Sequence, residues 1–276
     1  MSKTWLITGA SSGLGREMAC RLLARGDRVV ATVRREEALA DLEQQYDGTL
    51  TVLKLDVTDF ARTRSVMDDA FAQAGRIDVV VSNAAYGLFG AAEELTDEQI
   101  EHQIAANLTG SIQLIRAALP HLRRQGGGRV VQVSSEGGQM AYPNFSLYHA
   151  TKWGIEGFVE SVAQEVAPFG IDFIIAEPGP TATNFGASLV RPAAMAVYDD
   201  TPAGEVRRAV DNGSFDIRGD ATRTVDAIIA AADSETPALR LTLGSTAYES
   251  MSKALGNRLA SLQAQRGIAL SADRDE

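Results

Sequence analysis

The sequence predicts an α/β fold in which a parallel, doubly wound sheet of about seven strands lies between two layers of helices. Short apolar runs alternate with longer segments of helical periodicity along most of the chain. The connections between them are short, which favours right-handed crossovers that cover both faces of the sheet. A glycine-rich turn separates the first strand from the first helix. Because α/β folds of roughly 250 residues often form one unit, we expect a single domain over residues 1–276.

Composition restricts the classes of partner. The 276 residues are 45% hydrophobic and 22% charged, as in an ordinary globular protein, and the net charge is -10. This acidic balance argues against nucleic acid and anionic membranes as partners. Cys20 is the only cysteine, so no intrachain disulfide can form. No apolar run reaches the roughly 18 residues of a membrane span. No secretory signal precedes the first strand, so we expect a cytoplasmic protein, without a bound metal.

The first strand and the first helix flank the turn Gly9–Gly15. Residues 4–8 are an apolar run suited to a buried strand, and Met18 and Leu22 continue at helical spacing. A strand, a glycine turn and a helix in this order place backbone N–H groups and a helix N-terminus against a pyrophosphate. Glycine is also frequent in ordinary turns. The glycine-rich turn indicates a nucleotide site because it stands between a strand and a helix.

The second strand is expected at residues 28–33 and bears on the choice of nucleotide. In dinucleotide folds the end of this strand faces the adenosine ribose, where an acidic residue binds a free 2′-hydroxyl and an arginine suits a 2′-phosphate. Val33 stands where the acidic residue would be expected, and Arg34 and Arg35 follow it. Two solvated arginines that open a helix are the alternative. We favour NADP(H) over NAD(H), with Arg34 as the main contact.

The third and fourth strands repeat the alternation. Residues 50–55 form an apolar run that ends at Asp56, and residues 59–74 have helical periodicity. Residues 79–81 form the fourth strand. Strand, helix and strand with short connections argue for parallel pairing.

A longer helix is expected to begin with Thr96 as a capping residue and to run to about Arg124. Asn107 lies near its middle, where asparagine lowers helix propensity. Such a residue is more often solvated or locally bonded than functional. The run Gly126–Gly128 ends the helix.

The fifth strand, residues 129–134, leads into the stretch on which the functional prediction depends. Ser135 ends the strand, and Tyr148 and Lys152 stand four residues apart on one face of the next helix. A phenol with a reference pKa near ~10 is a poor acid or base at neutral pH, and a nearby ammonium lowers that pKa. A tyrosine tuned in this way can exchange a proton with a hydroxyl, as carbonyl reduction requires. An ordinary surface pair on a helix is the alternative.

The remaining elements complete the sheet. The helix of Tyr148 should continue to about Pro168, and residues 171–176 form the sixth strand. A helical pattern covers residues 222–232, and residues 239–243 read as the seventh strand. Residues 246–265 resemble a closing helix, after which the tail becomes polar and is expected to fray.

These motifs, taken in order, resemble the short-chain dehydrogenase/reductase family, in its single-domain subgroup. The resemblance covers about residue 4 to residue 245. The C-terminal part of the chain is similar to a bacterial branch of the family labelled retinol-dehydrogenase-like. Ser135 lies 13 positions before Tyr148, as is usual in such enzymes. The matching motifs are Thr8-Gly-x-x-x-Gly-x-Gly15, Asp56, Asn83-Ala84, Asn107, Ser135, Tyr148-x-x-x-Lys152 and Pro178-Gly179 with Thr183.

The resemblance implies a Rossmann-type fold and hydride transfer between the nucleotide and a ketone, an aldehyde or a secondary alcohol. Tyr148 would exchange the proton with the substrate oxygen, and Ser135 would position that oxygen. Lys152 would lower the pKa of the tyrosine and hold the nicotinamide ribose. Asn107 would anchor a water that links the lysine to solvent.

The resemblance also implies the residues that contact the nucleotide. Two positions depart from the usual pattern: Ala85 adds a methyl group where glycine is common, and Ser12 replaces a basic residue found in many NADP-preferring members. The expected contacts, beside Tyr148, Lys152 and Arg34, are Gly9, Ser11, Ser12, Gly13, Leu14, Gly15, Asp56, Val57, Asn83, Ala84, Pro178, Gly179, Thr181 and Thr183.

The substrate side is expected to be mainly apolar. Residues 186–220 form a long insertion, which we expect to be a lid with a short helix or two. Tyr142, Phe145 and Phe185 would line the pocket with it. Glu136 either adds a polar contact or is a solvated loop carboxylate. His149, which should point away from the reacting groups, receives no role.

By analogy with the family, we expect a homodimer or homotetramer that pairs the helices around Asn107 and Lys152, and a small-molecule carbonyl or alcohol substrate. Two other functions stay open. One is a nucleotide-binding regulator without catalysis, and the other is a different reaction, such as epimerisation or dehydration, on the same scaffold.

Overall fold

The seven predicted strands form one sheet. The computed structural model describes residues 2–274, and its main sheet has the strand order β3-β2-β1-β4-β5-β6-β9. All six pairings in this sheet are parallel, which confirms the predicted doubly wound α/β fold. Each strand lies within two residues of its predicted bounds: β1 Thr4–Thr8, β2 Arg28–Val33, β3 Leu50–Lys54, β4 Val79–Ser82, β5 Gly128–Val133, β6 Ile171–Pro178 and β9 Arg240–Leu243.

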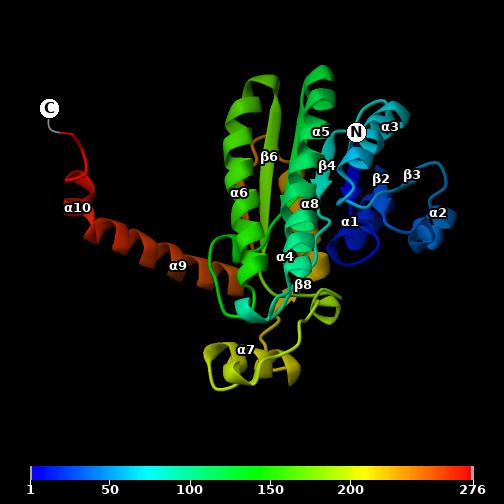
Figure 1. Cartoon of the computed structure of the whole chain (residues 1–276). Helices are drawn as coiled ribbons and strands as arrows, with labels where there is room; N and C mark the ends of the chain where they lie inside the picture. Colours follow the sequence, from blue (N-terminus) through cyan, green and yellow to red (C-terminus); the bar gives the residue numbers. More distant parts are fainter. Residues whose placement is uncertain (1, 275–276) are drawn as a thin grey trace.

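Helices cover both faces of the sheet (Figure 1). α1 and α8 pack on one face, and α3, α5 and α6 pack on the other. The helices are α1 Gly13–Ala24, α2 Ala40–Gln45, α3 Phe60–Ala74, α4 Asp97–Gln103, α5 Gly110–Arg124, α6 Ser146–Val166, α7 Pro202–Asp211, α8 Ala221–Asp233, α9 Ser245–Ala264 and α10 Arg266–Leu270.

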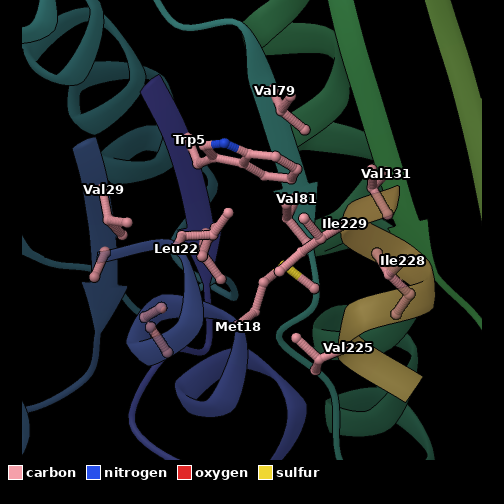
Figure 2. Close-up of a cluster of buried hydrophobic side chains, with 14 of the residues drawn as sticks. Trp5, Met18, Leu22, Val29, Val79, Val81, Val131, Val225, Ile228 and Ile229 are labelled. Carbon is pink, nitrogen blue, oxygen red and sulfur yellow. The ribbon is translucent and has the colours of Figure 1, made fainter. Parts of the chain in front are cut away.

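The sheet is buried on both faces, which explains why its strands read as continuous apolar runs. Along β1, Trp5 and Ile7 face α1 and α8, whereas Leu6 faces the opposite layer. Figure 2 shows Met18 of α1 and Ile228 and Ile229 of α8 in one buried cluster over the sheet with Trp5 of β1. Burial of such side chains contributes roughly 25 cal/mol of stabilisation per Å² of apolar surface removed from water. This packing therefore stabilises the arrangement of strands on which the site depends.

The helix predicted over residues 96–124 is interrupted. α4 and α5 are separated by a π-helical segment, Ile104–Thr109, which contains Asn107. Both amide atoms of Asn107 bond the backbone of Tyr86: Nδ2 donates to its carbonyl over 2.8 Å, and Oδ1 accepts from its N–H over 3.0 Å. The asparagine is therefore neither solvated nor bonded within its own helix, and it lies at one of the irregular turns that are frequent at functional sites.

The order of the strands creates a crevice at one edge of the sheet. β1 pairs with β2 on one side and with β4 on the other, so the chain proceeds in opposite directions from β1. At such a switch point, the loops that follow the two strands diverge and leave space for a ligand at the carboxyl ends of the strands.

The segment 186–220 is folded and its two ends meet. β7, Thr181–Ala182, lies shortly before the segment and pairs in parallel with β8, Gly219–Asp220, at its end. Within it lie the 3-10 turns Gly186–Ser188 and Ala196–Tyr198 and helix α7, in agreement with the expected short helices.

The C-terminal helices α9 and α10 extend away from the body of the molecule (Figure 1). The predicted helix over residues 246–265 is confirmed as α9, and the tail that was expected to fray carries α10 as far as Leu270. Within residues 2–274, no helix combines the length and the apolar character that crossing a membrane requires.

Candidate active site

A cavity of about 1170 Å³ opens at the carboxyl ends of the strands. It brings together residues from the glycine-rich turn, the ends of β2 to β6, helix α6 and the segment 186–220. Of the predicted site residues, Gly15 and Asn107 are outside its lining. The others line it: Gly9, Ser11, Ser12, Gly13, Leu14, Arg34, Asp56, Val57, Asn83, Ala84, Ser135, Glu136, Tyr142, Phe145, Tyr148, Lys152, Pro178, Gly179, Thr181, Thr183 and Phe185.

Close backbone packing explains two of the glycines. Gly9 has φ +65, and a Cβ there would lie 2.8 Å from the Cα of Ala84. At Gly15 a Cβ would lie 2.5 Å from the carbonyl oxygen of Gly9 and from Nδ2 of Asn83. Gly15 therefore allows the helix to approach the turn from behind, rather than lining the cavity.

The side chain of Asn83 holds this turn in place. Its Nδ2 donates to the carbonyls of Thr8, over 2.9 Å, and Gly9, over 3.2 Å. The buried Thr8 hydroxyl accepts in turn from the N–H groups of Asn83 and Ala84. The amide that the family resemblance placed along the adenosine thus joins the ends of β1 and β4.

The N-terminus of α1 faces the cavity without a side-chain cap. Ser12 is the N-cap residue but makes no capping hydrogen bond, and the first turn holds no acidic residue. A Cβ on Gly13 would meet nothing closer than Thr183, at 4.0 Å. The positive end of the helix dipole and its free N–H groups therefore suit an anionic group such as a phosphate.

Arg34 and Asp56 stand at the opposite rim. Arg34 is exposed, as is Asp56, which accepts hydrogen bonds from the N–H and the hydroxyl of Thr58. Partial burial raises the pKa of Asp56. The hydrogen bonds from Thr58 and the charge of Arg34 lower it by more, so the pKa lies below its ordinary value. Asp56 is thus an ionised acceptor, and no ion pair occupies Arg34 within residues 2–274.

Ser135 and Tyr148 meet in the middle of the cavity lining. The Ser135 hydroxyl accepts from the N–H of Gly137 over 3.1 Å and reaches the Pro178 carbonyl at 3.5 Å. Tyr148 is buried, and burial raises the pKa of its phenol to about 12; Ser135, which can hydrogen-bond the phenolate, opposes the rise, and the charge of Glu136 adds to it.

The lowering of this pKa by Lys152, expected from the spacing, is therefore not found. Lys152 is also buried, and its Nζ donates to the Val133 carbonyl over 3.0 Å while lying 5.5 Å from the centre of the Tyr148 ring. Burial lowers the pKa of Lys152 to about 8, against the opposing effect of Glu156. Loss of hydration is the largest cause of both shifts, because both side chains are enclosed.

The polar residues under the reacting groups were missed in the sequence. Glu156 of α6 and Glu177 of β6 are buried, and Arg240 of β9 binds both carboxylates. Glu156 also accepts from the hydroxyl of Ser134 and from Gln139. Charged residues within otherwise apolar strands were the available signal, because such residues are rarely buried unless they are paired.

The wall of the cavity beside Tyr148 is aromatic. Phe145 packs between Tyr142, at 5.3 Å between ring centres, and Phe89, at 4.9 Å. Phe185 lies 5.7 Å from Tyr148. His149 is buried with no hydrogen-bond partner for either ring nitrogen among the described residues, and burial lowers its pKa to about 4, so a neutral packing role agrees with the absence of an assigned function.

Glu136 is not the solvated loop carboxylate that the sequence left open. It is 4% exposed, and its Oε2 accepts from the hydroxyl of Ser250 on α9 over 2.7 Å. The two glycines after it are required by packing, because a Cβ on Gly137 would lie 2.6 Å from His149 and one on Gly138 would overlap Glu156. The carboxylate is therefore held against the cavity by its surroundings.

Another buried carboxylate, Glu94, holds the segment 186–220 in place. Its Oε1 accepts from the N–H of Met195, over 2.8 Å, and from Arg207 of α7, while its Oε2 accepts from the N–H of Ala91. Asn144 adds a bond to the Ala203 carbonyl over 2.6 Å. The segment is thus attached to the body, and its residues form part of the cavity lining.

Comparison with known proteins places this geometry among enzymes. Residues 3–193 match the family described as short chain dehydrogenase. The chain is 34% identical to oxidoreductase BOA17 of Botryotinia fuckeliana over 273 residues, which covers 98% of this chain and 99% of that protein.

Solved structures agree. A short-chain dehydrogenase from Streptomyces avermitilis superposes with a TM-score of 0.92 at 39% identity, covering 99% of this chain and 98% of that one. A short chain dehydrogenase from Burkholderia cenocepacia in complex with NADP has the same fold, with a TM-score of 0.74 at 24% identity, covering 96% and 97% of the two chains.

The ionic cluster under the site gives a prediction about stability. Replacing Arg240→Met should lower the free energy of unfolding at neutral pH by about 3–5 kcal/mol, because two buried carboxylates lose their cation. The loss should shrink on acidification, since burial and the charge of Glu156 already raise the pKa of Glu177 to about 7 and protonation removes the buried charge.

The measurement is urea unfolding followed by circular dichroism at neutral and at mildly acidic pH. Arg218→Met, which breaks an exposed pair with Asp216, is the control and should change stability by less than about 1 kcal/mol. An Arg240→Met loss of equal size at both pH values would contradict the assignment of the effect to unpaired carboxylates.

Proposed function

The chain belongs to the short-chain dehydrogenase/reductase family and is an oxidoreductase, and we propose that it transfers hydride between NADP(H) and a ketone or aldehyde, or the matching secondary alcohol, with Tyr148 as the acid/base. The observation that carries this proposal is the enclosure of Tyr148, Ser135 and Lys152 in the same cavity as the glycine-rich turn. A proton-transfer group and a place for a phosphate-bearing ligand thus share one space.

The residues present fit a nicotinamide nucleotide. The uncapped N-terminus of α1 and the open surface at Gly13 would receive the pyrophosphate. Asp56 and Val57 would lie against the adenine, and Thr181 and Thr183 would hold the carboxamide. The bound nucleotide supplies the hydride donor or acceptor.

Proton transfer is the part assigned to the protein. With a pKa of about 12, the Tyr148 phenol is protonated at neutral pH and suits donation of a proton to the oxygen of a carbonyl under reduction. Ser135 would hold that oxygen by a hydrogen bond. Lys152 would stabilise the phenolate that remains, because an ammonium 5.5 Å from the ring centre offsets part of the cost of a buried negative charge.

The preference for NADP(H) rests on two neighbouring positions. Val33, at the end of β2, provides no carboxylate for a ribose 2′-hydroxyl, and Arg34 lines the cavity next to it. A guanidinium with no ion-pair partner within residues 2–274 is suited to bind a 2′-phosphate. Serine at position 12 leaves Arg34 as the main source of this preference.

A homodimer or homotetramer is proposed for the same chain. Ile104 and Trp153 are 37% and 43% exposed and lie on the helical segments next to Asn107 and Lys152. Large apolar side chains on one face favour contact with another protein surface. Pairing across these helices would stiffen the segments that carry the site.

Tyr148→Phe tests the acid. The variant should lose at least about 100-fold in kcat for reduction of a ketone by NADPH, because the proton donor is removed. Nucleotide affinity, measured by fluorescence of bound NADPH, should change little. Turnover close to that of the parent protein would remove Tyr148 from its proposed role.

Arg34→Asp tests the nucleotide preference. The ratio of kcat/KM for NADPH over NADH should fall by about tenfold or more, because a charge-assisted bond is replaced by repulsion of the 2′-phosphate. Arg35→Asp makes the same charge change one residue further along and should have a smaller effect. If this ratio stays at the parental value in both variants, Arg34 does not bind the 2′-phosphate.

Ile104→Glu combined with Trp153→Glu tests the oligomer. Light scattering coupled to size exclusion should give a dimer or tetramer for the parent chain and a smaller species for the double variant. Phe169→Glu, at an exposed aromatic residue after α6, is the matched control. An unchanged mass in the double variant would place the interface elsewhere.

A further inference from the structure

Glu136 is a buried carboxylate of which one oxygen accepts a hydrogen bond from the protein. Its Oε2 accepts from Ser250. Its Oε1 accepts no hydrogen bond, and the carboxylate forms no ion pair, within residues 2–274. Oε1 is not one of the fully enclosed side-chain atoms that lack a partner, so it keeps contact with the open cavity. A buried carboxylate gains from a hydrogen-bond donor at such an oxygen. The free oxygen belongs to a side chain that lines the cavity, so its missing partner would come from what the cavity holds.

Of the cations that line the cavity, none forms an ion pair with Glu136 within residues 2–274, and the ammonium of Lys152 donates to the Val133 carbonyl. Tyr142, Phe145, Phe185 and Leu189 form an aromatic and aliphatic surface on the substrate side. Arg191 also lines the cavity, but its guanidinium pairs with Asp211 and stacks 5.0 Å from the centre of the Phe89 ring. A single polar group set in an apolar wall is the usual means by which a pocket orients its ligand.

The position of Glu136 relates it to the reacting groups. It follows Ser135 directly and lines the same cavity as Tyr142 and Tyr148. The carboxylate and the phenol that would give its proton to the substrate therefore face the same bound ligand.

We propose that Glu136 recognises a hydrogen-bond donor, a hydroxyl or a protonated amine, that the substrate carries next to its reacting carbon. This inference rests on the proposed function and narrows its substrate class to apolar carbonyl compounds or alcohols with an adjacent donor. A hydrogen bond to an ionised carboxylate is about twice as strong as one between neutral groups, and it would satisfy the oxygen that the protein leaves free. An apolar side chain at this position would pack equally well if shape alone mattered.

The test compares three ligands that differ in one group: a phenyl ketone, its α-hydroxy derivative and its α-amino derivative. Each ligand has a fully substituted α-carbon, so the hydroxyl cannot be oxidised. Calorimetry measures their Kd for the protein saturated with oxidised nucleotide, under which condition no ketone can be reduced. The parent chain should bind at least one derivative about tenfold or more tightly than the plain ketone. Glu136→Met, which keeps the length of the side chain and removes the acceptor, should bring these ratios close to one.

Two further variants separate charge from structure. Glu136→Gln keeps a neutral acceptor, so it should lose the preference for the amine and retain part of any preference for the hydroxyl. Glu165→Gln removes an exposed carboxylate from α6 and should leave all ratios at the parental value. Thermal unfolding and nucleotide affinity report whether each variant is folded.

The outcomes decide between the two proposals. Equal or undetectable affinity of the parent chain for the three ketones, or a preference that survives Glu136→Met, overturns the role of Glu136. If Glu136→Met is not folded, Glu136→Gln decides by the same ratios. A Glu136-dependent preference in binding without reduction by NADPH would support the recognition role and count against the proposed function, whereas reduction without preference would do the reverse.

Discussion

The attraction between Arg240 and the buried carboxylates of Glu156 and Glu177 is the interaction on which the site depends. These residues come from β9, α6 and β6, and Glu156 also holds Ser134, the residue before Ser135. Two acids without a cation would repel each other in a medium of low dielectric, and they would drive apart the elements that carry the proposed proton donor. The apolar layers determine the order of the strands, but this cluster determines how the ends of β5, β6 and α6 face the cavity.

Enclosure has opposite effects on the two groups of the Tyr148–Lys152 pair. Burial raises the pKa of the phenol to about 12 and lowers that of the ammonium to about 8, so both groups move toward their neutral forms. A pocket of this kind keeps the tyrosine protonated until the substrate oxygen becomes negative and takes the proton, or until a positive charge next to the phenol stabilises the phenolate. Glu136 acts in the same direction, because its charge also disfavours the phenolate.

The sequence was sufficient for the architecture because the central strands are buried on both faces and the helices that pack on the sheet are buried on one. Continuous apolar runs such as residues 4–8 and helical spacing such as that of Met18 and Leu22 report this burial directly. The glycine-rich turn was predictable for a related reason, since Gly9 and Gly15 allow backbone contacts that any side chain would prevent.

What could not be predicted depends on partners that are distant in the chain. Asn107 receives its surroundings from the backbone of Tyr86, and the hydrogen bond of Glu136 comes from Ser250, 114 residues away. The enclosure that raises the pKa of the tyrosine depends on aromatic side chains from three separate stretches. Local spacing identifies which groups are available, whereas their protonation is decided by what surrounds them.

The short ribbon of β7 and β8 has a consequence for how this scaffold can change. Because Thr181–Ala182, just before the segment 186–220, pair with Gly219–Asp220 at its end, the polypeptide leaves and returns at nearly the same place. Lengthening such an excursion costs little additional closure entropy, with each doubling adding about 0.6 kcal/mol. This part of the cavity lining can therefore diverge in length and composition during evolution while the strands and the proton-transfer residues keep their positions.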